Sequence, residues 1–131
     1  MIVVDASVLA PALAEDGPRG DQARARLRRE QLTAPELVDL EVAAVLRRLK
    51  ARGLVDDRRA QLALVDLVAV PLRRAPHLGL LPRVWALRDN LTPYDAAYVA
   101  LAEQLDVTLL TADGRLAGAP GVSCDVEVLG T

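Results

Sequence analysis

Residues 1–9, with the sequence MIVVDASVL, place an apolar run, an acidic residue and the start of an apolar helix in direct succession. The run over residues 2–5 predicts a short buried strand that ends at an acid, because no polar residue alternates within it. A helix is expected from Ala6 onward. Proline is tolerated near the first turn of a helix only, so Pro11 is expected to limit this one.

The rest of the chain alternates between strand patterns and helix patterns. Further strands are predicted at residues 32–34, 107–111 and 126–129, with an edge strand as one interpretation of residues 70–72. Helices are predicted at residues 20–30, 36–52, 56–68, 78–88 and 92–105, with breaks at residues 15–18 and at Gly53. This alternation predicts an α/β fold of three layers, α/β/α, with a central, mostly parallel sheet of four to five strands.

Length and composition limit the class of protein. A chain of 131 residues suits a single domain, residues 1–131, and 52% hydrophobic residues argue against disorder. Aromatic residues make up only 2%, so the core must consist of Leu, Val and Ala. The single cysteine, Cys124, excludes an internal disulfide and favours a cytoplasmic location. No signal peptide is expected at this N-terminus, and no apolar run is long enough to span a membrane.

Basic residues are unevenly distributed although the net charge is only −2. Between Arg19 and Arg59 there are 11 Lys and Arg residues against 7 Asp and Glu residues, and arginine supplies 15 of the 16 basic residues of the chain. A compositional bias and a phosphate-binding surface both remain open as explanations.

Four carboxylates stand where soluble proteins usually place apolar or small side chains. They are Asp5 after the first strand, Glu41 within the apolar stripe of the helix 36–52, Asp95 at the start of an apolar helix, and Asp113 after the strand 107–111. A partly buried carboxylate without a partner costs free energy, so a cation is expected nearby. Ligands of parallel sheets bind outside the carboxyl ends of the strands, and this rule places Asp5 and Asp113 at one site.

Three of these acids have a purely structural alternative. Asp5 would cap the helix that follows it. Asp95 would belong to a capping box that begins at Thr92. Asp113 precedes Gly114 and would suit an ordinary turn.

Glu41 is harder to explain in this way, because its best alternative partner, Arg48, lies beyond the usual reach along a helix. Asp39 is expected on the solvent side of the same helix. Asp66 also interrupts an apolar run, but it follows no strand and Arg59 lies on its helix face, so it is left out of the site. His77, the only histidine, is interpreted as a surface residue.

The segments around the four acids resemble the PIN domain, and more narrowly the VapC-type toxins of bacterial toxin–antitoxin pairs. The matching segments are residues 3–9, 34–37, 41–48, 91–103 and 109–116. Their order and spacing cover nearly the whole chain, which makes the resemblance specific. It implies an acidic quartet at Asp5, Glu41, Asp95 and Asp113, with the hydroxyls of Ser7 and Thr111 lining the same site.

The resemblance implies an endoribonuclease dependent on Mg²⁺ or Mn²⁺, the toxin of a type II toxin–antitoxin system. A water activated by the metal would attack the phosphorus and leave 5′-phosphate and 3′-hydroxyl ends. Asp5, Asp95 and Asp113 are the expected principal ligands, and Glu41 would be a ligand or a base. The implied partners are RNA, a VapB-like antitoxin and a second copy of the chain, alone or within a toxin–antitoxin hetero-oligomer. Whether the target is transfer, ribosomal or messenger RNA stays open.

One departure from the family pattern keeps an alternative open. Many members carry another Asp or Asn shortly after the Thr-x-Asp segment, whereas Gly114, Arg115 and Leu116 follow here. A non-catalytic PIN-like module that binds RNA or protein is therefore the second hypothesis. A phosphotransfer α/β domain is the third, but it would need a lysine near the acids, and Lys50 is expected on the polar face of its helix.

Overall fold

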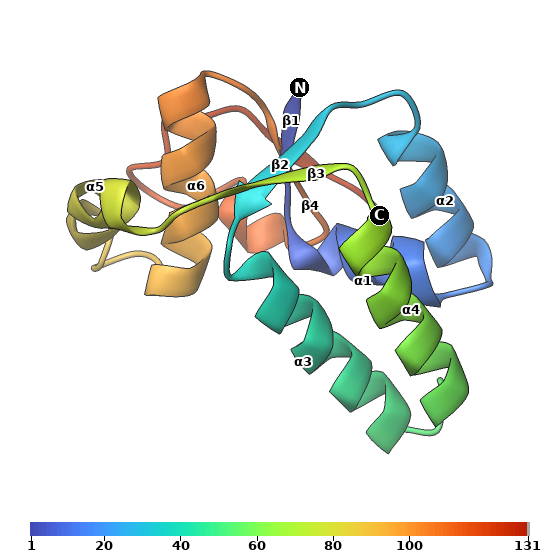
Figure 1. The fold of residues 1–131 in the computed structure, drawn as a ribbon. Helices are drawn as coiled ribbons and strands as arrows, with labels where there is room; N and C mark the ends of the chain where they lie inside the picture. The colour runs from blue at the N-terminus through green and yellow to red at the C-terminus, as the bar shows by residue number, and fades with distance from the viewer. Residues whose placement is uncertain (131) are drawn as a thin grey trace.

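The computed structural model describes residues 1–130, so Thr131, the last residue of the predicted single domain, lies outside the described residues. Five strands form one sheet in the order β3-β2-β1-β4-β5 (Figure 1). They are β1 (Ile2–Val4), β2 (Leu32–Pro35), β3 (Leu72–Ala75), β4 (Leu109–Thr111) and β5 (Val126–Val128). Every pairing is parallel, and Val3 of the central strand lies opposite Thr33 on one side and Leu109 on the other. The predicted parallel sheet is confirmed. The edge strand predicted at residues 70–72 lies at residues 72–75, and β5 forms the other edge.

The helices form the two outer layers of the predicted α/β/α arrangement. They are α1 (Ala6–Ala14), α2 (Pro18–Leu27), α3 (Val38–Ala51), α4 (Asp57–Ala69), α5 (Leu81–Ala86) and α6 (Pro93–Leu105), with 3₁₀ turns η1 (Leu78–Leu80) and η2 (Gly114–Leu116). On one face α1 contacts α2, α3 and α4, whereas α6 packs on β1, β2 and β4 and is joined by α5. Helices α3 and α4 form an antiparallel hairpin that extends beyond the sheet (Figure 1). No helix within residues 1–130 has the length and apolar character needed to cross a membrane.

The strand order reverses next to β1. From β1 the chain moves outward through α1 and α2 to β2 and through α3 and α4 to β3, and it then returns through α5 and α6 to β4 on the other side of β1. Crevices at such reversals are where open parallel sheets bind ligands, at the carboxyl ends of the strands. Asp5 directly follows β1 and Asp113 comes two residues after β4. The topology therefore brings both acids to the same edge of the sheet.

Helix α6 is unusual because it is buried over its whole middle part. Residues 96–102 are all buried, and Tyr98 is only 1% exposed. A helix that is apolar all round lies inside a protein, and here the sheet covers one side and α5 another. Asp95, the residue before this segment, is therefore attached to a rigidly packed helix.

The expectation that Pro11 would limit the first helix is wrong. Helix α1 continues through Pro11 to Ala14, although Pro11 has no N–H to donate to the carbonyl four residues earlier. The residues before it, Val8, Leu9 and Ala10, are almost completely buried. Their packing in the core offsets the missing hydrogen bond.

Two polar side chains that the sequence places at the surface instead fix the amino end of α3. Asp39 binds Arg74 of β3 through hydrogen bonds of 2.8 to 3.0 Å, so it does not simply face solvent. His77 is half-buried, and its Nε2 accepts the backbone N–H of Leu37 at 2.9 Å. Both contacts hold the turn of α3 that carries Glu41 against the edge of the sheet.

Candidate functional site

Asp5 lies at the carboxyl end of β1 and is only 8% exposed. Its Oδ2 accepts hydrogen bonds from Ser7 Oγ at 2.9 Å and from Thr111 Oγ1 at 2.7 Å. Asp5 is the N-cap residue of α1, but its carboxylate makes no capping bond, so capping does not account for its side chain. Among residues 1–130 no basic side chain forms an ion pair with Asp5, and the two hydroxyls alone hold this buried carboxylate in place.

The two hydroxyls join the ends of β1 and β4. Ser7 Oγ accepts the backbone N–H of Ala112 at 2.9 Å, and Thr111 Oγ1 accepts that of Asp113 at 3.0 Å. The two oxygens lie 3.3 Å apart. Because each hydroxyl accepts from the loop after β4 and donates to Asp5, the orientation of Asp5 is coupled to the position of the Asp113 backbone.

Glu41 is half-buried on α3, and Tyr98 of α6 donates to its Oε1 at 2.6 Å. Burial raises the pKa of Glu41, the hydrogen bond from Tyr98 lowers it in part, and the charges of Asp5 and Asp95 raise it further. Arg48 affects Glu41 through its charge and makes no hydrogen bond to it within residues 1–130. The Arg48 alternative is therefore wrong, because the partner lies on another helix.

Tyr98 was missed by the sequence argument. Burial and the neighbouring Glu41 raise the pKa of Tyr98 far above its ordinary value, so its hydroxyl remains a hydrogen-bond donor. A signal for it exists in the sequence. Tyr98 lies within an otherwise aliphatic buried helix, where a tyrosine hydroxyl usually needs a hydrogen-bond partner. Glu41, an acid within the apolar stripe of another helix, is a suitable acceptor.

Asp95 lies half-buried in the first turn of α6. Its backbone N–H donates to Thr92 Oγ1 at 3.2 Å, so Thr92 is the helix cap. Burial raises the pKa of the Asp95 carboxyl, and the charges of Asp5 and Asp113 add to this effect. Capping accounts for the backbone of Asp95, whereas its carboxylate is electrostatically coupled to the other acids.

Asp113 is the N-cap residue of the turn η2 and binds Arg115 in two ways. Its Oδ1 accepts the backbone N–H of Arg115 at 3.0 Å, so the expected turn role is present. The guanidinium of Arg115 also donates to both carboxylate oxygens, with Nε to Oδ1 at 3.0 Å and Nη2 to Oδ2 at 2.6 Å. These bonds hold the pKa of Asp113 below its usual value. Asp95, Asp113 and Arg115 line one cavity of about 350 Å³.

The four acids are linked electrostatically through Asp95, which is affected by Asp5 and Asp113 and itself affects Glu41. Asp5 raises the pKa of both Glu41 and Asp95, and Asp113 raises that of Asp95. They do not form a closed cage, because no three Asp, Glu, His or Cys side chains within residues 1–130 meet closely enough to surround a metal ion. Glu41 is turned toward Tyr98 and Asp113 toward Arg115.

The donor chemistry of the site fits a hard divalent cation. The carboxylates and hydroxyls of the site offer oxygen atoms as ligands. The pKa values of Glu41 and Asp95 are raised by burial and, to a smaller extent, by the charges of neighbouring acids. Mg²⁺ usually keeps several waters and is bound through only one or two carboxylates, so a closed protein cage is not required.

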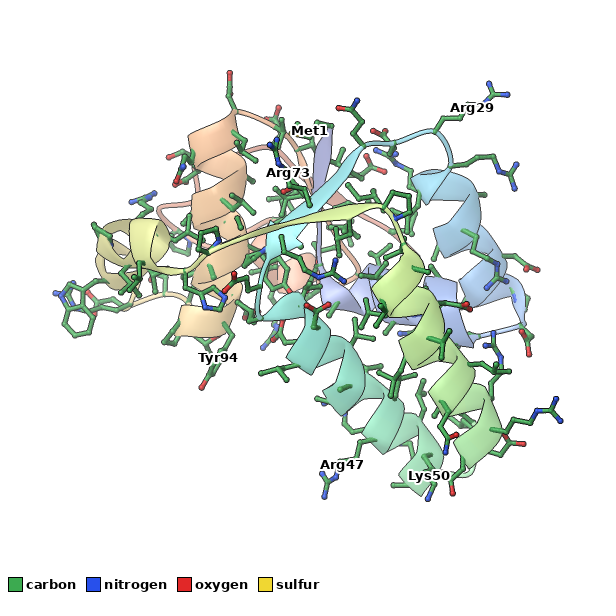
Figure 2. All side chains as sticks on the ribbon, in the orientation of Figure 1. Met1, Arg29, Arg47, Lys50, Arg73 and Tyr94 are labelled. Carbon is green, nitrogen blue, oxygen red and sulfur yellow. The ribbon has the colours of Figure 1, made fainter. Side chains whose placement is uncertain are left out.

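Other surface features lie away from these acids. A larger cavity of about 910 Å³ lies at the amino ends of the strands and is lined by Met1, Arg29 and Arg73, which Figure 2 shows at one end of the molecule. None of the four acids lines it. Arg47 and Lys50 lie at the opposite end, far along α3 (Figure 2). Arg29 and Arg73 therefore lie at the opposite end of the molecule from Arg47 and Lys50.

Comparisons with known proteins agree with the fold and the motifs. The PIN domain family matches residues 2–122. Ribonuclease VapC9 of Mycobacterium tuberculosis is 46% identical over 132 residues, which cover 98% of each chain. The crystal structure of VapC20 from the same species, a toxin that cleaves the sarcin–ricin loop, superposes with a TM-score of 0.69 at 19% identity and covers 94% of this chain and 97% of that one. A toxin–antitoxin complex from Klebsiella pneumoniae gives a TM-score of 0.62 at 22% identity, covering 94% of this chain and 96% of the other. The chain therefore belongs to the PIN-domain family and, within it, to the VapC group.

Proposed function

We propose that this protein is a divalent-metal-dependent endoribonuclease and the toxin of a type II toxin–antitoxin pair. The observation that carries the proposal is the placement of Asp5 and Asp113 at the carboxyl ends of the neighbouring strands β1 and β4. Glu41 of α3 and Asp95 of α6 face this edge closely enough that burial and the charge of Asp5 raise the pKa of both. Such a site would repel RNA phosphates by itself, so a cation is needed for substrate binding as well as for chemistry. The ribonuclease VapC9, at 46% identity, supports RNA as the substrate.

The residues of the site divide into ligands and positioning groups. Asp5, Asp95 and Asp113 are the proposed ligands, directly or through water, and Glu41 is a further ligand or the base that orients the attacking water. A bound divalent cation would lower the pKa of a water molecule and neutralise phosphate charge. Ser7 and Thr111 fix the orientation of Asp5, and Tyr98 fixes that of Glu41. Attack in line with the leaving 3′-oxygen would give 5′-phosphate and 3′-hydroxyl ends.

An RNA cleavage assay with a matched acidic control tests the proposal. Asp5→Asn removes a charge at the site, whereas Asp66→Asn removes one from an exposed position on α4. With Mg²⁺ or Mn²⁺ we expect RNA cleavage by the wild type and by Asp66→Asn, and with a chelator we expect none. In Asp5→Asn we expect the cleavage rate to fall at least about a hundredfold, the loss expected for an essential polar group. Equal cleavage by the wild type and Asp5→Asn, or cleavage that survives the chelator, would contradict the proposal.

We also propose a VapB-like antitoxin and a second copy of this chain as partners. The outer face of α4 exposes Leu64, Val65 and Val68, the last of which is 83% exposed, and Leu40 on α3 is 77% exposed. Val68 lies four positions after Leu64 and three after Val65, the two spacings that place side chains on one face of a helix. These side chains therefore form an apolar surface of the kind that protein partners cover. The Klebsiella pneumoniae complex shows that a chain of this fold occurs in a toxin–antitoxin assembly. Light scattering on the chain alone, and with the product of a small adjoining gene, tests both partners; a monomer in both samples would contradict them.

A further inference from the structure

The Arg115 guanidinium lies directly against the carboxylate of Asp113, one of the proposed metal ligands. Its guanidinium reaches both oxygens of the Asp113 carboxylate, and the two residues line the same cavity as Asp95. The positive charge of Arg115 also holds the pKa of Asp95 down in part, against the opposing effect of burial. Arg115 therefore acts on two of the proposed metal ligands.

The ion pair contributes little to holding the fold together. The side chain of Arg115 is 85% exposed, and its pairing with Asp113 is local, between residues two positions apart. Asp113 Oδ1 caps the turn η2 by accepting the backbone N–H of Arg115, and this bond does not depend on the Arg115 side chain. Ion pairs at exposed positions are weak and readily replaced, so a divalent cation can displace this guanidinium.

We propose that Arg115 and a divalent cation are alternative partners of Asp113, so that Arg115 is a built-in competitor that sets the metal affinity of the site. This inference rests on the proposed function, because it assumes that Asp113 is a metal ligand. In the metal-bound protein the Arg115 guanidinium is released from Asp113 and remains at the wall of the cavity. In the metal-free protein it covers the Asp113 carboxylate.

A nearby arginine provides a matched control for the general effect of charge. Arg48 influences Glu41 through its charge, but it makes no hydrogen bond to a site carboxylate within residues 1–130. Arg48→Gln and Arg115→Gln both remove one positive charge near the acids. Only Arg115→Gln removes a group that is bound to a proposed ligand.

Calorimetric titration with Mn²⁺ tests the competition. We expect Arg115→Gln to bind Mn²⁺ about two- to fivefold more tightly than the wild type, the change that corresponds to losing one weak ion pair. Arg48→Gln is expected to change the affinity by less. Equal gains in the two variants, or unchanged or weaker binding by Arg115→Gln, would overturn the proposal.

A measurement on the unmodified protein keeps the proposal testable if a variant fails to fold. In a ¹⁵N nuclear magnetic resonance spectrum, the Arg115 Nε–H signal is expected to shift during titration with Mg²⁺ and to reach its end point at the stoichiometry of metal binding. Saturation with Mg²⁺ while this signal stays unchanged would overturn the competition and leave the proposed function intact. Failure of the wild type to bind Mg²⁺ at all would overturn both.

Discussion

Replacing Tyr98 by Phe removes a single hydroxyl from the centre of the protein and tests how Glu41 is held. The hydroxyl donates to Glu41 Oε1 at 2.6 Å from a side chain that is 1% exposed. Hydrogen bonds to charged groups contribute roughly 1.5–3 kcal/mol to stability. Glu41 is only half-buried and water can partly replace the lost donor, so we expect Tyr98→Phe to cost about 1–2 kcal/mol. In a domain of this size, that loss lowers the midpoint of thermal unfolding by roughly 3–8 °C.

Urea denaturation at pH 7 measures this loss, with Tyr94→Phe as the control. Tyr94 is 63% exposed and points away from the end of α6 (Figure 2), so removing its hydroxyl is expected to change stability by less than about 0.5 kcal/mol. The same change at Tyr98 is then repeated in a Glu41→Ala background, which forms a double-mutant cycle. The reasoning would be refuted if Tyr98→Phe cost the same with and without Glu41, because the hydroxyl would then act through another group.

Two further predictions concern the pH dependence of stability and the packing of α2. The pKa values of Glu41 and Asp95 are raised in the folded protein. Their contribution to stability is therefore full at acidic pH and is lost as the pH rises through the folded-state pKa values. We expect bound Mg²⁺ to reverse this loss. Urea denaturation between pH 4 and 8 checks this against Glu41→Gln and Asp95→Asn, which should flatten the trend. In Gly20→Ala the new Cβ would lie 1.8 Å from the Glu15 carbonyl oxygen, so a loss of about 1–3 kcal/mol is expected. Gly118→Ala, with no atom within 4 Å, is its control and is expected to change little.

The features that were predictable from the sequence are those that depend on local patterns. Short apolar runs mark β1 and β4, and the acids that follow them fall at the strand ends because the chain must leave the sheet there. Alternation of helices and strands is sufficient to predict a parallel sheet with helices on both faces, which the structure confirms. The start of α6 at Pro93, with Thr92 as its cap, is similarly local.

Pairings between distant residues could not be predicted in this way. Tyr98 and Glu41 are 57 positions apart, and His77 and Leu37 are 40 apart, so nothing in either local segment identifies its partner. The continuation of α1 through Pro11 depends on burial by other elements, which overrides the local cost. The Asp113–Arg115 pair is different, because the two residues are only two positions apart and the signal was present. In the family pattern, however, position 115 is notable only because a further acid is missing there.

The most direct test of the central claim is an anomalous difference map from crystals grown with Mn²⁺. The claim is that Asp5, Glu41, Asp95 and Asp113 form one metal-dependent centre at the carboxyl edge of the sheet. It predicts a Mn²⁺ peak in direct or water-mediated contact with the carboxylates of Asp5, Asp95 and Asp113, with the Arg115 guanidinium moved away from Asp113. A peak elsewhere on the protein, or no peak at these acids in crystals of protein that cleaves RNA with Mn²⁺, would contradict it.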